Sequence, residues 1–232
     1  MCIDRRFSRH AWRVTPEHAR RLQEELRHFV IPIGTLSQLH LVAGADVAYD
    51  RPSCRMFAGI VVLQLPDFQI VETRMAVRQT TFPYIPGLLS FRETPALLAA
   101  WKQVSHTPDV LFIDGHGLSH PRRFGLACHV GVLIDRPVIG CAKSRLIGTY
   151  EEPPPTRGST SWLYDETGHI IGAVVRTRGG TRPVFVSVGH RIDLQEAVRV
   201  TLLCSKGYRL PEPIRQADQF VERIKRARRR TS

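Results

Sequence analysis

Cysteines are few in this sequence and follow no pairing pattern. The 232 residues contain five, an odd number, and no two of them form a C-x-x-C motif. The five are Cys2, Cys54, Cys128, Cys141 and Cys204. Closely spaced cysteines are typical of zinc sites, and even sets of them are typical of the disulfide frameworks of secreted domains. We therefore expect buried, reduced thiols, no disulfide partner and a cytoplasmic protein.

Long hydrophobic runs are also missing. Apolar stretches such as GIVVLQL at residues 59–65 have the length of a strand, far short of the ~20 apolar residues that a membrane helix needs. The opening segment MCIDRRFSRHAWR is charged and lacks the apolar core of a signal peptide. The sequence therefore predicts neither a membrane segment nor a secretion signal.

Several well-known motifs are absent as well. The sequence holds no P-loop, no Rossmann glycine fingerprint and no G-x-S-x-G nucleophile motif. It shows no internal repeat and no long linker, and its one proline-rich break, EEPPPTRGSTS at residues 151–161, is typical of a surface loop. We expect a single domain over residues 1–232, with a basic C-terminal helix and tail at about residues 211–232.

Positive charge, by contrast, is abundant. The chain has 33 Lys and Arg residues against 21 Asp and Glu residues, which gives a net charge of +12 at pH 7. Such an excess favours polyanions such as nucleic acid or an anionic membrane surface. Solubility alone would also explain the charge, so the partner has to be inferred from motifs.

The pattern of apolar residues predicts an α/β fold. A helix start at Thr15-Pro16 precedes three β-branched runs at residues 41–79, whose short separating turns predict an antiparallel meander. A helix from about residue 90 or 94 to 104, the strand DVLFIDGHG, the helix FGLACHVGVLID and the strand PVIGCAKS follow. A hairpin (WLYDETGHIIGAVVRT), a strand (PVFVSVG) and two helices complete the chain. This order predicts a mixed sheet flanked by helices, the layout of ribonuclease H-like nucleases.

Three acids lie where a metal site would need them. Asp46 is inside an apolar strand, where a charge is costly without a partner, and Asp114 ends the buried run VLFID. Glu93 closes the stretch TFPYIPGLLSFRE at residues 81–93. Carboxylates with substrate phosphate suit Mg²⁺, which supports phosphodiester cleavage. Alternatively, Glu93 forms a capping box with Ser90, Asp46 forms a salt bridge and Asp114 caps a turn.

Basic residues follow the second aspartate. The segment HGLSHPRR contains His116, His120, Arg122 and Arg123, and its glycine and proline argue against a zinc-binding helix. The arginines suit phosphates, although a solvated loop is the simpler interpretation. Lys143 follows a buried strand, where an ammonium group would stabilise a phosphate or leaving oxygen, or pair with one of the acids.

The stretch at residues 81–93 also presents an aromatic side chain. Pro83 and Pro86 flank Tyr84 and Ile85, and each proline fixes φ and limits the entropy of the loop. A core element avoids such a rigid tyrosine. We therefore expect a loop that holds Tyr84 at a fixed angle, ready to stack on a base.

Together these segments resemble the endonuclease V family of deoxyinosine-directed repair nucleases. The matching segments are GADVAYD, FPYIPGLLSFRE, FIDGHGLSHPRRFGLACHVGV, IGCAKSRLIG and VSVGHRIDL, and the opening W-x-V-T-x-E-x-A fits the first helix of the family. The resemblance implies a ribonuclease H-like hydrolase that depends on Mg²⁺, with Mn²⁺ as a substitute. It also implies that the enzyme nicks DNA at the second phosphodiester bond on the 3′ side of deoxyinosine. Mismatched DNA is expected as a further substrate, and the protein is expected to be a monomer.

The resemblance assigns roles to particular residues. Asp46, Glu93 and Asp114 correspond to metal ligands, and Lys143 corresponds to the catalytic-site lysine. The strand-separating wedge corresponds to Pro83, Tyr84, Ile85 and Pro86. The wall of the pocket for the flipped base corresponds to Gly87, Leu88, Gly115, His120 and Gly125.

One position departs from the family pattern. The motif PEPTRLAH reads PEPIRQAD here, so Asp218 takes the place of a histidine near the metals. The alternative for Asp218 is a solvent-facing side chain that pairs with Arg215. Two other functions stay open: cleavage of RNA at inosine, and nucleic-acid binding without catalysis. The form HPRRFGLACHVG, which resembles the bacterial version of the motif, favours DNA.

Overall fold

The computed structural model describes residues 10–229. Cys2 and the last residues of the basic tail, 230–232, lie outside this range. The strands are β1 (Leu41–Asp50), β2 (Arg55–Gln64), β3 (Gln69–Gln79), β4 (Val110–Ile113), β5 (Val138–Ala142), β6 (Thr160–Tyr164), β7 (Ile170–Val175) and β8 (Val184–His190). The helices are α1 (Pro16–Leu26), the short η1 (Arg27–Phe29), α2 (Leu89–Trp101), α3 (Leu126–Ile134), α4 (Leu194–Leu203) and α5 (Glu212–Arg229).

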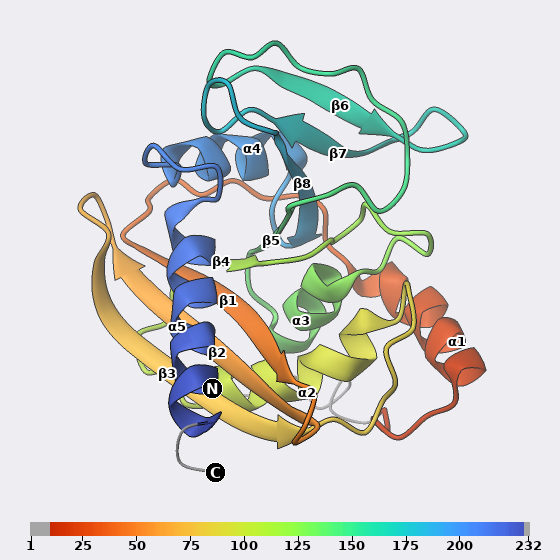
Figure 1. The fold of residues 1–232 in the computed structure, drawn as a ribbon. Helices are drawn as coiled ribbons and strands as arrows, with labels where there is room; N and C mark the ends of the chain where they lie inside the picture. The colour runs from red at the N-terminus through yellow and green to blue at the C-terminus, as the bar shows by residue number, and fades with distance from the viewer. Residues whose placement is uncertain (1–9, 230–232) are drawn as a thin grey trace.

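All eight strands form one mixed sheet, in the order β3-β2-β1-β4-β5-β8-β7-β6 (Figure 1). The meander β1-β2-β3 is antiparallel, β1, β4 and β5 are parallel, and β8, β7 and β6 continue antiparallel. Helices cover both faces, which confirms the predicted α/β layout of a mixed sheet flanked by helices.

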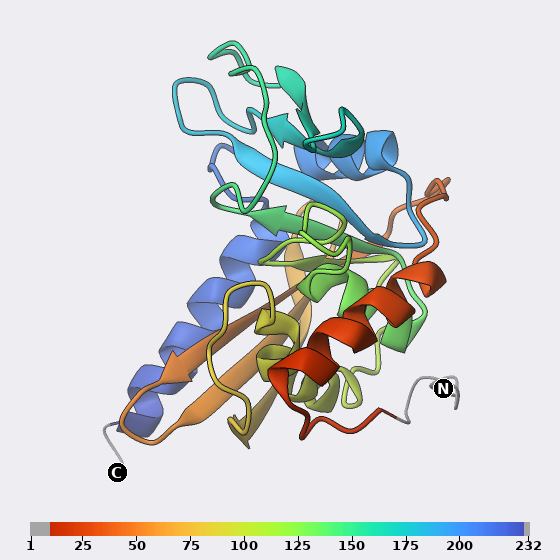
Figure 2. The ribbon, with the colours of Figure 1, turned by 90° about the vertical axis from the view of Figure 1, so that its right-hand side faces the viewer.

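The two faces of the sheet carry separate apolar cores. One core joins the sheet to α4 and α5, and includes Val42, Phe112, Val200 and Ile214. The other joins the sheet to α2 and α3. Figure 2 shows the sheet between these layers, with α5 on one side and α1, α2 and α3 on the other. The helices therefore bring side chains from both faces to the edges of the strands.

The last helix approaches the sheet unusually closely. A Cβ atom added to Gly44 in β1 would lie 1.9 Å from the carbonyl oxygen of Pro213 in α5. Glycine is therefore needed at this position, because any larger residue would push α5 away from β1. The contact fixes where the next turns of α5 lie relative to the following residues of β1.

Helix α2 begins earlier than one of the two expected starts. The helix runs from Leu89, so Pro95 lies inside it and the expected start at Thr94-Pro95 is wrong. Packing of Phe91, Leu97 and Trp101, all buried, holds the helix in spite of the proline. The N-cap residue Leu88 makes no side-chain capping bond, so the capping box of the sequence pattern is not formed.

The prediction of buried thiols is confirmed for three of the four described cysteines and is wrong for Cys54. Cys128, Cys141 and Cys204 are buried free thiols, whereas Cys54 is exposed in the turn between β1 and β2. No helix within residues 10–229 combines the length and the apolar character that a membrane span requires.

Candidate active site

Three aspartates from distant parts of the chain converge at one point. One carboxylate oxygen from each of Asp46, Asp114 and Asp218 lies within 4.8 Å of the others, and all three residues are half-buried. Asp46 belongs to β1, Asp114 directly follows the neighbouring strand β4, and Asp218 comes from α5. We call these three residues the acid cluster.

Strand pairing explains why the first two aspartates are neighbours. The parallel register pairs Ala45 with Ile113, the residues that directly precede the two aspartates. The backbone N–H of Asp114 donates to the Ala45 carbonyl at 3.3 Å, which extends the ladder by one step. Both carboxylates therefore lie where β4 ends, the usual place for a site in an open sheet of this kind.

Helix α5 supplies the third carboxylate. Arg215, the expected partner of a solvent-facing Asp218, pairs instead with Glu212 through its Nε at 2.7 Å. Asp218 is half-buried beside the two strands and contacts Lys143 at 3.2 Å. The structure thus places Asp218 in the acid cluster rather than in an ion pair with Arg215.

Lys143 connects two members of the acid cluster. Its Nζ lies 2.7 Å from Asp114 Oδ2 and 3.2 Å from Asp218 Oδ1. Burial of the ammonium group opposes its charge, but the hydrogen bonds and charges of the two aspartates outweigh burial and raise the pKa of Lys143. The lysine is therefore a permanent cation, at the end of β5.

Glu93 lies close enough to Asp46 and Asp114 to be affected by their charges, but it is not a member of the acid cluster. Burial, followed by the charges of Asp46 and Asp114, raises the pKa of Glu93 to about 8. Burial, followed by the charge of Asp114, raises the pKa of Asp46 to about 6. These crowded acids favour a cation, because opposite charge nearby stabilises their ionised forms.

A pocket of about 130 Å³ lies beside these residues. Its wall contains Gln23, Tyr84, Ile85, Pro86, Gly87, Leu89, Ser90, Gly115, His116, His120, Gly125, Leu126 and Leu146. Most residues that were expected around a flipped base are therefore in this wall. Leu88 is the exception: it is fully buried against Leu22 and Phe91, because the chain turns at Gly87 (φ +77°) and directs Leu88 into the core.

Three of the four residues of the expected wedge are exposed, whereas Ile85 is half-buried and packs against the apolar cluster that contains Phe82 and Phe91. Pro83 and Pro86 are exposed, and the side chain of Tyr84 is 68% exposed at the rim of the pocket. The tyrosine ring is therefore open to solvent at the mouth of the pocket. This position suits an aromatic ring that stacks on a bound molecule.

The carbonyl of Gly87 anchors this loop to the rest of the site. It accepts hydrogen bonds from Gln23 Nε2 at 3.1 Å and from Arg122 Nη2 at 2.8 Å, and His120 Nε2 lies 3.0 Å away. Arg122 Nε also donates to Gln23 Oε1 at 2.6 Å. Arg122 therefore holds the loop in place, so the alternative of a solvated arginine is wrong at this position.

The other polar residues of the HGLSHPRR segment are also structural in the free protein. Burial lowers the pKa of both His116 and His120 to about 4, so both imidazoles are neutral at physiological pH. His116 contacts the Ser119 hydroxyl at 2.8 Å and the Ser144 carbonyl at 3.0 Å. Arg123 forms an ion pair with Asp165, in the turn between β6 and β7.

Some site residues were not expected from the sequence. Gln23 carries the only usable signal, because it lies on the apolar face of the first helix with Ala19 and Leu26 and is fully buried there. Leu146 and Ser90 gave no signal of this kind. The Ser90 hydroxyl is buried without a hydrogen-bond partner among the described residues.

Comparisons with known proteins point to one family. The family model "Endonuclease V" matches residues 24–219. An endonuclease V of Dehalococcoides mccartyi is 50% identical over 208 residues, which cover 90% of this chain and 93% of the relative. The crystal structure of an endonuclease V from Streptomyces avermitilis is 42% identical, with a TM-score of 0.89, and covers 96% of this chain and 97% of its own.

A third relative was solved with nucleic acid. The endonuclease V of Ciona intestinalis, in complex with a 24mer DNA containing an inosine followed by a ribo-adenosine, is 26% identical, with a TM-score of 0.80. The superposition covers 91% of this chain and 98% of that one. From the family match, the sequence identity and the shared fold, this chain belongs to the endonuclease V family.

Proposed function

We propose that the protein is a metal-dependent endonuclease that nicks DNA on the 3′ side of deoxyinosine, at the second phosphodiester bond. The observation that carries the proposal is the position of the acid cluster and Lys143 next to a base-sized pocket. Family membership and the inosine-containing DNA bound by the Ciona relative support the choice of substrate.

The donor set of the acid cluster fits a hard divalent cation. Asp46, Asp114 and Asp218 offer carboxylate oxygens, the ligand type of Mg²⁺ and Mn²⁺, and Glu93 lies within the influence of the charges of Asp46 and Asp114. A divalent ion bound there supplies an activated water and stabilises the leaving oxygen. Lys143 places a permanent positive charge beside the scissile phosphate.

The pocket and the rigid loop account for the choice of base. An enzyme that acts beside a base has to take that base out of the stack, and the energetic cost is least for a poorly paired base such as hypoxanthine. The pocket receives the flipped base, while exposed Tyr84 stacks into the gap that it leaves. The hydrogen bonds to the Gly87 carbonyl keep the loop in position for this exchange.

RNA is the second candidate substrate. The nucleic acid bound to the Ciona relative has a ribonucleotide directly after the inosine. The same wedge and pocket would serve an inosine in either nucleic acid, so the assay has to include both.

A nicking assay tests the proposal. End-labelled oligonucleotides with one inosine, as DNA and as RNA, and matched strands with adenosine are incubated with Mg²⁺, Mn²⁺ or EDTA. We expect one product from inosine DNA, cut at the second bond on the 3′ side, and none in EDTA. Cleavage that ignores the inosine, or that persists in EDTA, would contradict the proposal.

A pair of variants links the activity to the acid cluster. Asp114→Asn should lose nicking, whereas Asp135→Asn changes an acid that pairs with Arg191 away from the cluster and should keep it. Both variants must melt as folded proteins for the comparison to count.

A further inference from the structure

A second groove, of about 560 Å³, adjoins the acid cluster. The short segment of residues 143–146 separates it from the base pocket: Leu146 lines the pocket, whereas Lys143 and Arg145 line the groove. Its walls also contain Tyr150, Glu152, Arg182 and Arg209. We call this feature the basic groove.

Lys143 is paired with the acid cluster, but the arginines of the basic groove lack an ion-pair partner among the described residues. Glu152 is the one acid in its wall, and its carboxylate is already paired with Arg176 at 2.7 Å. Within residues 10–229, no carboxylate forms an ion pair with Arg145, Arg182 or Arg209. Uncompensated guanidinium groups that share a concave surface attract an anion.

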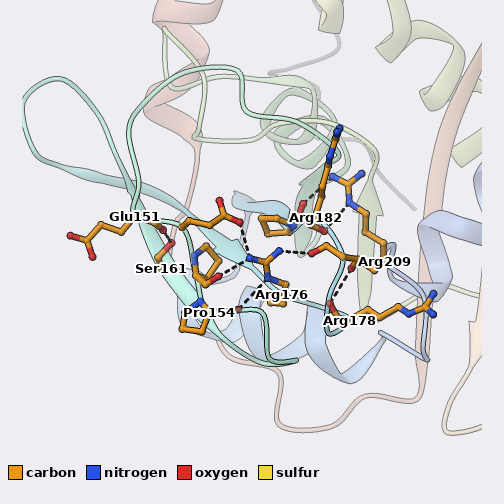
Figure 3. A network of polar contacts seen from close by, with 11 residues as sticks. Glu151, Pro154, Ser161, Arg176, Arg178, Arg182 and Arg209 are labelled. Carbon is orange, nitrogen blue, oxygen red and sulfur yellow. Dashed lines mark hydrogen bonds and ion pairs between the residues drawn. The ribbon is translucent and has the colours of Figure 1, made fainter.

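Arg209 illustrates this crowding of charge. Its guanidinium donates to the carbonyl of Arg182 at 3.0 Å (Figure 3). It also donates to the carbonyls of Pro183, at 2.9 Å, and of Lys143. Burial, together with the nearby charge of Arg182, lowers the pKa of Arg209. The two arginines are therefore held side by side, and the backbone of Lys143 is tied to the same point.

A buried arginine fixes the loop that brings Glu152 to the groove. Arg176 is 7% exposed and donates to the carbonyls of Pro153 at 2.6 Å, of Pro154 at 3.2 Å and of Thr181 (Figure 3). These bonds hold the proline-rich loop of residues 151–161 against the end of β7. The groove is thus formed before a ligand arrives, so binding does not have to order its walls.

An aromatic side chain completes the surface. The ring of Tyr150 packs edge-on against Phe185, at 5.5 Å between centroids, and lies 5.8 Å from Cζ of Arg145. Arginines beside a fixed aromatic ring are typical of surfaces that bind single-stranded nucleic acid, where phosphates meet the charges and a base stacks on the ring.

We propose that the basic groove binds the substrate strand on the 3′ side of the cut. The inference rests on the proposed function: a base in the pocket places the nucleotides that follow it beyond the acid cluster. Lys143 contacts that cluster and also lines the groove, so a strand that leaves the cluster past Lys143 enters the groove directly. The backbone phosphates would then lie against Arg145, Arg182 and Arg209.

Arg182→Glu tests the inference, because Arg182 is exposed in the groove and its side chain is not part of the acid cluster. The matched control is Arg136→Glu, the same charge change just before β5, at the opposite end of that strand from Lys143. Binding is measured by fluorescence anisotropy in EDTA. The first strand carries one inosine with an arm of about 12 nucleotides on each side, a length within the site sizes of single-strand binding surfaces. A second strand has its 3′ arm shortened to just past the cut position, and a third has its 5′ arm shortened.

We expect Arg182→Glu to weaken binding about fivefold on the strands with a long 3′ arm. The slope of log affinity against log salt concentration should fall by about one unit on the same strands. On the strand with the short 3′ arm, it should bind as the wild type does. Arg136→Glu should differ little from the wild type on all three strands. Wild-type affinity of Arg182→Glu on the long strand, or an equal loss on all three strands, would overturn the inference.

The two proposals fail in different measurements. If the proposed function is wrong, the wild-type protein shows no preference for the inosine strand over its adenosine counterpart, or cuts it in EDTA. If only the groove is wrong, the wild type cuts the inosine strand as expected, and Arg182→Glu shows no loss that depends on the 3′ arm.

Discussion

The ammonium nitrogen of Lys143 lies 2.7 Å from Oδ2 of Asp114. The same nitrogen contacts Asp218, so one lysine bridges two of the three aspartates of the acid cluster. This bridge places positive charge in direct contact with the acid cluster. Any change in the number of carboxylates therefore alters both the attraction for a metal and the position of the lysine.

Asp218→His should change the metal requirement. Loss of one carboxylate weakens the attraction for divalent cations, so the Mg²⁺ concentration for half-maximal nicking should rise. An imidazole at this place can also donate to the scissile phosphate, so turnover at saturating Mg²⁺ should rise. Asp218→Asn is the matched control, because it removes the charge without adding an imidazole. Superimposable Mg²⁺ titrations of wild type and Asp218→His would show that Asp218 plays no part in metal binding.

Asp46→Asn should abolish nicking and yet stabilise the metal-free protein above neutral pH. The pKa of Asp46 is raised to about 6, so the folded state binds this proton more tightly than the unfolded chain, whose aspartates titrate near ~4. The stability that Asp46 contributes when protonated is lost as the pH rises from about 4 to about 6. In EDTA at pH 8, Asp46→Asn should therefore melt above the wild type, and at pH 4 the two should melt together.

Asp135→Asn provides the control of opposite sign for this melting experiment. Hydrogen bonds from Arg191 lower the pKa of Asp135, so its charged form stabilises the fold above the pH at which an unfolded aspartate titrates. Asp135→Asn should melt below the wild type at pH 8. A lower melting temperature for both variants would mean that the ionised form of Asp46 does not destabilise the folded protein.

Tyr84→Ala should weaken binding to inosine DNA more than binding to undamaged duplex. Stacking of an aromatic ring on a base contributes roughly 1–3 kcal/mol, which corresponds to about tenfold to a hundredfold in affinity. Tyr164→Ala, which truncates an exposed tyrosine on the edge strand β6, is the control. Equal losses on both DNAs would assign Tyr84 to the shape of the loop alone.

Arg223→Gln with Arg226→Gln should lower the salt dependence of binding. Both arginines are exposed and share a surface of α5 with Asp218, so they can bind phosphates next to the acid cluster. The slope of log affinity against log salt should fall by about one unit for each phosphate that the variant no longer binds. Substitution tests this better than deletion of the tail, because Val221 and Ile224 of the same helix pack against Ala48 and Phe57. An unchanged slope would leave the helix end as a solvated surface.

Much of the fold was predictable because its signals are local. β-Branched runs with short turns indicated the meander, and Thr15 with Pro16 indicated the first helix, whose Thr15 hydroxyl accepts from the His18 N–H at 3.2 Å. The start of α2 was harder. A proline after a threonine is a good local start, but the packing of Phe91 against Leu88 and Phe82 extends the helix by more than a turn before it.

The site was predictable where one motif carries it and unpredictable where contacts cross the chain. The adjacency of Asp46 and Asp114 follows from strand order, but the contact of Asp218 with Lys143 depends on how α5 crosses the sheet. The anchoring of Gly87 by Gln23 and Arg122 joins three separate segments. The basic groove had no signal, because its arginines come from separate loops whose relative positions only packing decides.

The close seating of α5 on Gly44 bears on how the protein is made. Asp218 belongs to the helix at residues 212–229, which leaves the ribosome after both strands that hold the other two aspartates. A nascent chain therefore has no complete acid cluster until this helix has emerged and docked on the sheet. Before that point Asp46 and Asp114 lack the third carboxylate, and one face of the sheet lacks the apolar side chains of α5 that cover it.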